Sequence, residues 1–353
     1  MTNETAAIYQ PTRFSPLTQR RARLFFSNRK VVIACVLWLI LIVIGLFADA
    51  IATDKPWLLK YDGNVYFPLL FDYPETTFGG TLPTLANYSD PQVQHWILSK
   101  GYWVRAPVPW TWETIDIANT QTVPSPPSSR HWLGTDDAGR DVLARVIYGI
   151  RISLLFAVIV STGAVVLGTL IGGIQGYWGG RIDLYGQRFI EIWAGLPTLF
   201  ILMILSSMVT SSLGWLTLTM VMFSWLSLVD IVRAEFLRTR NQDYVVAATL
   251  MGLPARTVMW RHILPNAMIS TLTFLPFTFT GAITTLTSLD FLGFGLPPGS
   301  ASLGELINQA RNNPQATWLA VTAFFSLTLL LSLMVFIGEG LRDAFDPRYE
   351  RRQ

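Results

Sequence analysis

Long runs of apolar residues, separated by short polar segments, dominate the chain. A helix needs about 20 mostly apolar residues to cross the hydrocarbon core of a bilayer. The runs that meet this requirement are Val31–Ile51, Ile152–Trp178, Ile192–Val229, Asn266–Leu289 and Asn313–Gly338. The third run is long enough for two helices if the chain turns near Ser211–Gly214. The pattern therefore predicts an all-α membrane protein with six transmembrane helices, and the region 130–340 holds all but the first.

The first apolar run also has the layout of a secretory signal peptide. Basic residues precede it, and the small-residue pattern Ala48-Asp49-Ala50 follows it, as at a cleavage site. About 30 residues precede the run, which is long for the basic region of a signal peptide. We therefore expect a retained transmembrane helix over 31–51, with a cleaved signal peptide as the alternative.

Basic residues concentrate in alternate polar segments of the chain. Cytoplasmic loops of membrane proteins carry an excess of Lys and Arg, so these segments are expected inside the cell. They include an N-terminal tail (1–30), a loop between the fourth and fifth spans (241–266) and a C-terminal tail (341–353). Both termini are then cytoplasmic. The long segment 52–129, in which acidic residues balance the basic ones, is then a periplasmic insert after the first helix.

The insert 52–129 is rich in Pro, Trp and Tyr, which predicts little regular helix. Its tryptophans include Trp96, Trp103, Trp110 and Trp112. They either line a ligand surface or pack together as a small cap over the membrane helices. The sequence favours packing and leaves the role of the insert open.

Composition supports the membrane assignment. Of the 353 residues, 51% are hydrophobic and 14% are charged, and the mean hydropathy is +0.40. An ordinary soluble domain carries about 25% charged residues. The net charge of +3 is too small to indicate nucleic-acid binding. Cys35 is the single cysteine, so no intrachain disulfide can form.

The sequence lacks the motifs expected of a nucleotide-hydrolysing, zinc-dependent or serine-dependent enzyme. It has no Gly-x4-Gly-Lys-Ser/Thr phosphate loop, no His-Glu-x-x-His pair and no Gly-x-Ser-x-Gly elbow. Its histidines, His95, His131 and His262, lie in three distant segments. We therefore expect no cofactor, no metal and no catalytic residue, with any ATP hydrolysis performed by another chain.

Small residues and a proline mark two of the predicted spans. Gly168, Gly172 and Gly176 are four residues apart in the second span, a spacing that lets helices approach closely. The partner of that face is either another helix of this chain or a second subunit. Gly195 and Pro197 predict a kink in the third span.

Two acidic residues fall at the ends of predicted spans. Asp230 lies near the inner end of the fourth span, three residues before Arg233. An acid at this place either takes part in transport or forms an ion pair at the interface with that arginine, and we favour the ion pair. Asp290 is similarly placed at the outer end of the fifth span.

The loop 241–266 has the pattern of two short helices with a break between them. Asp243 can cap the first helix by accepting free backbone N–H groups. Ala247 and Ala248 give that helix a bare face, which another protein can approach closely. Gly252 permits a backbone geometry that other residues resist, and so ends the helix.

Two prolines bound the second short helix of this loop. Pro254 suits its first turn, and Pro265 is expected to end it before the membrane run begins. An ordinary helical hairpin between two spans would also explain the pattern.

The loop resembles the EAA loop of ABC-importer permeases. It has two alanines, a glycine four residues after the second, and Leu-Pro twelve and thirteen residues beyond that glycine. The resemblance implies that the loop forms a coupling helix, which sits in a groove of an ATPase subunit. The residues that it assigns to coupling are Asp243, Ala247, Ala248, Gly252, Arg256, His262, Leu264 and Pro265.

Three further stretches resemble the C-type permease of the peptide/nickel branch of this family. They begin at His131, Asp290 and Gly338. The motif residues that the resemblance singles out are Gly134, Thr135, Asp136, Gly139, Arg140, Asp141, Asp290, Gly293, Gly295, Pro297, Gly340, Arg342 and Asp343. The long insert resembles that of the YejE-like peptide permeases. None of these motifs identifies substrate-binding residues.

The resemblance implies a permease subunit of an ATP-driven importer of oligopeptides or peptide-like compounds in the bacterial inner membrane. The implied partners are a second homologous permease, two ATP-binding subunits, a periplasmic substrate-binding protein and membrane lipid, with no nucleic acid. The alternatives are an ABC importer of nickel or another small solute, and a secondary transporter or channel driven by an ion gradient. The latter would need an intramembrane ionisable pair that is essential to transport.

Overall fold

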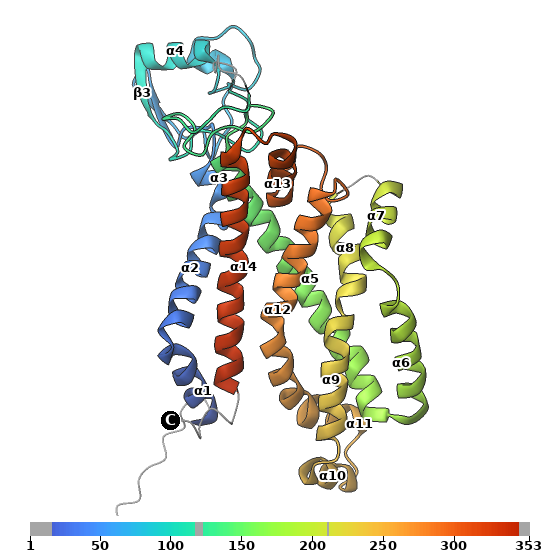
Figure 1. The fold of residues 1–353 in the computed structure, drawn as a ribbon. Helices are drawn as coiled ribbons and strands as arrows, with labels where there is room; N and C mark the ends of the chain where they lie inside the picture. Colours follow the sequence, from blue (N-terminus) through green and yellow to red (C-terminus); the bar gives the residue numbers. More distant parts are fainter. Residues whose placement is uncertain (1–15, 117–122, 210–211, 346–353) are drawn as a thin grey trace, which may run out of the picture.

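The computed structural model describes residues 16–116, 123–209 and 212–345 (Figure 1). The N-terminal part forms α1 (Pro16–Ser27), α2 (Arg29–Leu46), α3 (Ala48–Ile51), β1 (Leu58–Tyr61), β2 (Asn64–Tyr66), η1 (Glu75–Phe78), α4 (Pro91–Lys100) and β3 (Gly101–Val104). The rest forms α5 (Val142–Trp178), α6 (Gly180–Ala194), α7 (Thr198–Met208), α8 (Leu213–Ser224), α9 (Leu226–Thr239), α10 (Asp243–Leu250), α11 (Ala255–Thr257), η2 (Val258–Ile263), α12 (Leu264–Phe291), α13 (Leu303–Asn312) and α14 (Thr317–Phe345).

The predicted all-α membrane fold is confirmed in the described part of the chain, with five or six candidate spans. Five helical stretches are long and apolar enough to cross a bilayer, and the bent pair α6–α7 makes a sixth if it crosses as one span. The two helices of that pair meet at 70°, at the Gly195 and Pro197 break that the sequence predicts. The expected turn between the third and fourth spans includes residues 210–211, which lie outside the described residues.

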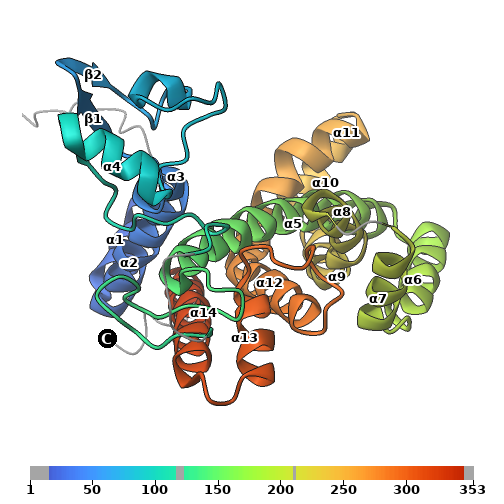
Figure 2. The same ribbon diagram turned by 90° about the horizontal axis from the view of Figure 1, so that it is seen from above.

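The second span begins earlier than its apolar run. α5 starts at Val142 and not at Ile152, because Asp141 caps it: the Asp141 Oδ1 accepts the backbone N–H of Ala144 at 2.8 Å. The resulting helix of 37 residues is longer than a perpendicular crossing needs. It therefore crosses the bundle obliquely, as Figure 2 shows, and touches helices at both ends of the molecule.

The insert contains more regular structure than the sequence predicts. A three-stranded antiparallel sheet, in the order β2-β1-β3, packs with α4 at one end of the molecule (Figure 1). Its core is aromatic, with the ring of Phe78 in edge contact with Tyr61, Tyr66 and Tyr88. The sequence pattern does not predict this sheet, because its strands have only three or four residues.

The four tryptophans of the insert that the sequence analysis singles out pack within the protein. Trp96 and Trp103 cover the aromatic core of the insert. Trp110 is buried, and Trp112 packs near Tyr148 of α5. The structure thus supports the cap interpretation for these side chains.

Close contact between α5 and α9 is the central packing feature of the membrane part. A methyl group on Gly172 would lie 2.5 Å from the carbonyl oxygen of Val229, and one on Gly176 would lie 2.5 Å from the Cβ of Phe236. Only glycine allows these two backbones to approach so closely. The glycine face of the second span therefore packs on a helix of the same chain, which decides between the two partners that the sequence leaves open.

The remaining helices enclose a common apolar core. Side chains from α5, α8, α12, α13 and α14 form one buried cluster, which includes Phe156, Leu216, Ile283, Leu306 and Leu319. The first span packs beside the last, where Val31 of α2 leaves no room for a side chain at Gly340 of α14. Gly340 of the C-terminal motif is thus a packing residue. Shortly after it, Arg342 is exposed and Asp343 is half-buried.

Candidate functional site

The loop segment, defined as residues 241–266, protrudes from the end of the molecule opposite the insert (Figure 1). Its first helix, α10, and the residue after it expose large apolar side chains to the surroundings. Leu250 is 83% exposed, Met251 is 75% exposed, and Val246 is 44% exposed. Ala247 lies between them and is also exposed. We call these four residues the α10 tip. An apolar surface of this kind on a protruding helix is typical of a protein contact.

Gly252 ends α10 in the way that the sequence predicts. Its φ is +81°, and a methyl group added there would have no atom within 4 Å, so backbone conformation alone requires glycine. The N–H of Leu253 donates to the carbonyl of Ala248, and the N–H of Gly252 donates to that of Thr249. This pair of bonds is a Schellman motif, which closes the helix and turns the chain towards α11.

Two expectations for α10 are wrong. Asp243 does not cap the helix: Gln242 occupies the cap position, and Asp243 is already helical, so its carboxylate cannot reach back to the free N–H groups. Ala248 does not face a partner, because it is 2% exposed within the chain. Val245 is buried beside Val232 and Phe236 of α9, and Ala248 lies almost one turn later on that same inward face.

The second half of the loop segment also differs from the expectation. Pro254 is the cap residue of α11, which continues through the π-helical turn η2 into α12 without a break. Pro265 lies in the first turn of α12 and does not end a helix. A π turn widens the helix and shifts its hydrogen bonds to the fifth residue, so the N–H that proline lacks is not needed there.

Hydrogen bonds join the two halves of the loop segment. The hydroxyl of Tyr244 donates to the carbonyl of His262 at 3.4 Å and accepts the side-chain N–H of Asn266 at 2.6 Å. Of the expected coupling residues, His262 therefore contributes through its backbone, and Leu264 packs against the cluster that holds Val245. Arg256 lies beyond the Gly252 turn, in the second half. The loop segment is thus a rigid extension of α12.

The first two permease motifs meet at the other end of the bundle. We call residues 131–145 and 290–302 together the outer clamp, after the orientation that the sequence predicts. Asp136 is fully buried there between Arg140, at 2.8 Å, and Arg145, at 3.4 Å. Both arginines also donate to the carbonyl of Gly299, and Arg145 donates to that of Ser300 at 2.7 Å. These charge-assisted bonds tie the start of α5 to the turn after α12.

Thr135 and Gly134 extend the outer clamp to α14. The hydroxyl of Thr135 accepts the N–H of Ser125, and its carbonyl accepts the indole N–H of Trp318 at 3.1 Å. Gly134 has a φ of +77°, and a methyl group there would lie 2.7 Å from the indole nitrogen of Trp318. Gly139, with a φ of +82°, makes the turn between Asp136 and Arg140. The motif residues therefore hold helices together.

Asp290 organises the second half of the outer clamp. Its carboxylate accepts the backbone N–H of Leu296 at 2.7 Å and the hydroxyl of Ser302. The carboxylate fills the space where Gly295 would carry a side chain, and Gly293 turns the chain with a φ of +79°. Pro297 accepts the N–H of Ser300 through its carbonyl. These bonds give the buried acid a structural role at the outer end of α12.

His131 connects the insert to α5. Its ring nitrogens lie 2.8 Å from Asp141 and 3.2 Å from Asp116, and its ring packs 4.8 Å from that of Trp110. Burial lowers the pKa of His131, but the hydrogen bonds and negative charges of Asp141 and Asp116 outweigh burial and raise it above 6.5. Arg130 also pairs with Asp116. In the described part of the chain, no group of three potential ligands could hold a metal ion.

The ion pair expected between Asp230 and Arg233 is wrong. Arg233 instead binds Asp183 of α6 with two hydrogen bonds, one of them at 2.7 Å. Asp230 is exposed, and its carboxylate lies 3.4 Å from the amide nitrogen of Gln187. The two residues are one turn apart on α9, but a tertiary partner on α6 offers the guanidinium a better two-point contact.

A pocket of about 420 Å³ lies between α12 and the break that separates α8 from α9. Its lining includes the hydroxyl-bearing residues Ser224, Ser227, Thr278 and Thr285 among apolar side chains. On α12 the hydroxyls of Thr278 and Thr285 donate to backbone carbonyls four residues earlier. The pocket is therefore mostly apolar, with a few hydroxyl groups and no charged side chain in its lining.

Several functional candidates are not evident from the sequence pattern. Arg145 escapes notice because it lies near the start of an apolar run, although a lone arginine there signals a buried partner. Val246, Leu250 and Met251 escape notice because the alanines carry the pattern of the loop. Large apolar side chains beside the alanines, in a loop that is predicted to lie outside the membrane, are the signal that would find them.

The fold and the two ends together define a class of protein. The chain is a multi-helix protein of the membrane type, with exposed apolar side chains on a loop at one end and a folded insert at the other. It belongs to the family of binding-protein-dependent transport system inner membrane components, which its residues 164–351 match. Family membership decides against a gradient-driven transporter or channel.

Individual relatives agree with this family. The inner membrane ABC transporter permease protein YejE of Escherichia coli (strain K12) is 52% identical over 336 residues, which cover 95% of this chain and 98% of that protein. The peptidoglycan transport system permease protein YejE of Agrobacterium fabrum is 45% identical, with 98% and 97% covered. The oligopeptide transport system permease protein OppC of Haemophilus influenzae is 34% identical, with 68% and 77% covered. The alignments with the two YejE proteins cover 95% and 98% of this chain. They therefore include most of the insert.

We predict that His131 makes the stability of the outer end depend on pH. A histidine whose pKa rises on folding contributes stability that is complete below its unfolded pKa of about 6.5 and is lost as pH rises through the folded value. The melting temperature of the purified protein should therefore fall as pH rises from below 6.5 through the folded pKa. His131→Gln should melt lower at acidic pH and lose this part of the slope. His95→Gln should keep the wild-type slope, and equal slopes in all three proteins would contradict the assignment.

Proposed function

We propose that this chain is a permease subunit of an ATP-driven importer of oligopeptides or peptide-like compounds. The observation that carries the proposal is the α10 tip, an apolar docking surface on a loop segment with the EAA pattern in a chain of this family. The names of the relatives support the substrate class, since they include peptidoglycan and oligopeptide transport systems. Nickel or another small solute is the alternative cargo.

The proposed assembly contains four kinds of component. This chain pairs with a second homologous permease, two ATP-binding subunits bind at the loop segments, and a periplasmic substrate-binding protein delivers the solute. The hydroxyl-lined pocket between α12 and the α8–α9 break supports a pathway at the boundary with the second permease, because a single subunit lines only part of a route. ATP hydrolysis belongs to the ATP-binding subunits, and this chain has no catalytic role.

Coupling follows from the rigidity of the loop segment. The ATP-binding subunit packs on the α10 tip. The small side chain of Ala247 lets that subunit come close to the helix, between Val246 on one side and Leu250 and Met251 on the other. Force on α10 passes through the Tyr244 bonds and the continuous η2–α12 helix to the hydroxyl face of the pocket. Gly252 sets the angle between the two halves. A movement of the ATP-binding subunits thereby alters access to the pathway.

The proposed orientation places both termini and the loop segment in the cytoplasm and the insert in the periplasm. Arginine supports it: the loop segment carries Arg256 and Arg261, whereas acids balance the basic residues of the insert. The arrangement agrees with the position of the insert and the loop segment at opposite ends of the bundle. The insert is then available to a substrate-binding protein.

Thiol labelling in intact cells checks the orientation. On a Cys35→Ala background, an impermeant maleimide should label Thr81→Cys in the insert and should spare Asn241→Cys in the loop segment. Both positions are exposed in the subunit, so accessibility within the fold does not differ. Permeabilised cells should show labelling at both. Labelling of Asn241→Cys but not of Thr81→Cys in intact cells would reverse the topology.

Uptake by whole cells checks the substrate class. Deleting the gene should reduce import of a radiolabelled, non-hydrolysable tripeptide to the background level, because half of the pathway is lost. Expressing the wild-type chain should restore import, and nickel accumulation should stay unchanged in both strains. Normal tripeptide import combined with lost nickel accumulation would favour the alternative cargo.

Substitution at the α10 tip checks the coupling surface. Leu250→Asp should weaken binding of the ATP-binding subunit by about 30-fold, since losing a buried apolar anchor costs about 2 kcal/mol or more. Leu70→Asp is the matched control, with a leucine that is 73% exposed on the insert. The measurement is copurification of the ATP-binding subunit and of the second permease with each variant.

Leu250→Asp should keep the second permease and lose the ATP-binding subunit, whereas Leu70→Asp should keep both. Gly252→Val should give the same pattern as Leu250→Asp through backbone strain of about 1–3 kcal/mol at positive φ. Wild-type amounts of the ATP-binding subunit with Leu250→Asp and Gly252→Val would show that α10 is not the docking helix.

A further inference from the structure

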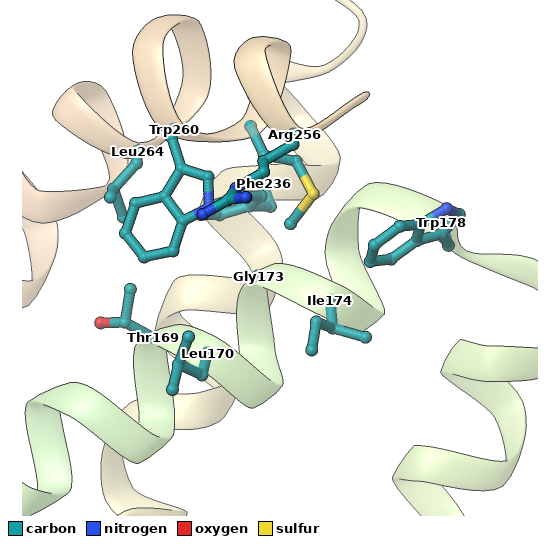
Figure 3. Close-up of a pocket in the computed structure, with 10 residues that line it drawn as sticks. Thr169, Leu170, Gly173, Ile174, Trp178, Phe236, Arg256, Trp260 and Leu264 are labelled. Carbon is teal, nitrogen blue, oxygen red and sulfur yellow. The ribbon is translucent and has the colours of Figure 1, made fainter. Parts of the chain in front are cut away.

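A second pocket lies beside the loop segment, between α5 and the start of the α12 helix. Its volume is about 330 Å³, and we call it the inner pocket. Figure 3 shows α5 residues facing Trp260 and Leu264 across it. The lining residues are Thr169, Leu170, Gly173, Ile174, Trp178, Phe236, Arg256, Met259, Trp260 and Leu264. Gly173 deepens the pocket, because its missing side chain leaves the ring of Phe236 uncovered.

The polar atoms of the inner pocket are few and of one kind. Among its lining residues Arg256 is the single charged side chain, and none carries a carboxylate. The Oγ1 of Thr169 is buried and has no hydrogen-bond partner within the described residues. Other threonines in the membrane helices, such as Thr271 and Thr284, donate to a carbonyl four residues earlier. The inner pocket thus offers a cation and a free hydroxyl within an apolar hollow.

The position of the inner pocket is that of a membrane boundary. Trp178 is the last residue of α5, and Trp260 lies in η2, just before α12. The two side chains are 51% and 52% exposed. Tryptophan is enriched where hydrocarbon meets the polar headgroups. Leu170 and Ile174 continue the exposed apolar surface of α5 away from this boundary, towards the membrane centre. A molecule bound in the inner pocket would therefore contact a cationic side chain at the level of the headgroups and apolar side chains further into the membrane.

We propose that the inner pocket binds an anionic phospholipid. Its acyl chain fills the hollow between α5 and η2, and its phosphate pairs with the guanidinium of Arg256, with the hydroxyl of Thr169 available to an ester oxygen. Charge complementarity favours an anionic over a zwitterionic headgroup, because no carboxylate of the pocket would attract a headgroup amine. The bound lipid bridges α5 and the helix that carries the loop segment. It therefore steadies the docking surface for the ATP-binding subunit, a consequence that rests on the proposed function.

Lipid retention by the purified transporter tests this proposal. The complete complex is placed in nanodiscs of phosphatidylcholine with phosphatidylglycerol as a minor component, transferred to detergent, and examined by native mass spectrometry. Wild-type complex should retain phosphatidylglycerol in preference to phosphatidylcholine. Arg256→Gln should lower the apparent affinity for phosphatidylglycerol by about fivefold, since one lost charge contact is worth about 1 kcal/mol near a membrane surface. Arg261→Gln, an arginine of the same segment outside the pocket, should leave it unchanged.

A second pair of variants separates the pocket from general charge effects. Leu170→Trp fills the mouth of the inner pocket and should abolish retention of both lipids, whereas Val166→Trp, one turn away on the same exposed face, should not. Equal retention of the two lipids by wild type, or no effect of Arg256→Gln and Leu170→Trp, would overturn the proposal. So would a photocrosslinker at Leu170 that captures the second permease in place of lipid. None of these outcomes depends on which solute is imported.

Discussion

The close approach of α5 to α9 is the contact on which the rest of the structure depends. Inside a bilayer, two helices gain little from burying apolar surface, so contact between backbones at glycine supplies much of their association. Gly172 and Gly176 bring α9 against α5. Phe236 is thereby held at the inner end, where it supports Val245 of the loop segment on one side and lines the inner pocket on the other. The proposed docking surface and the proposed lipid site therefore both depend on the contact between α5 and α9.

The two ends of the bundle are built from different interactions. The outer clamp uses buried charges, and removing one partner from a pair such as Asp136–Arg145 leaves the other without compensation, which makes the arrangement hard to alter. The end that carries the loop segment relies on apolar contacts, on neutral hydrogen bonds such as those of Tyr244, and on the ion pair of Arg233 with Asp183.

The predictions from the sequence are wrong at residues that can satisfy their hydrogen bonds or pack their side chains in more than one way. The sequence predicts that Pro265 stops a helix, but the π turn before it removes the need for the missing N–H. It predicts that Asp230 pairs with Arg233, but Asp183 of α6 reaches the guanidinium with both oxygens. It predicts that Ala248 faces a partner, whereas this residue faces the chain itself. For Arg233 and Ala248, the competing contact comes from elsewhere in the fold.

The sequence by itself determined the spans, the kink at Gly195 and Pro197, and the turn at Gly252, because apolar length and backbone preference are local properties. It also indicated the family, since the motif residues have fixed spacing. Only the tertiary structure decided that the glycines of α5 face α9, that Arg145 lies buried in the outer clamp, and that Leu250 and Met251 stand exposed. These properties depend on which distant surfaces meet, and a local pattern of apolar and polar residues does not specify that.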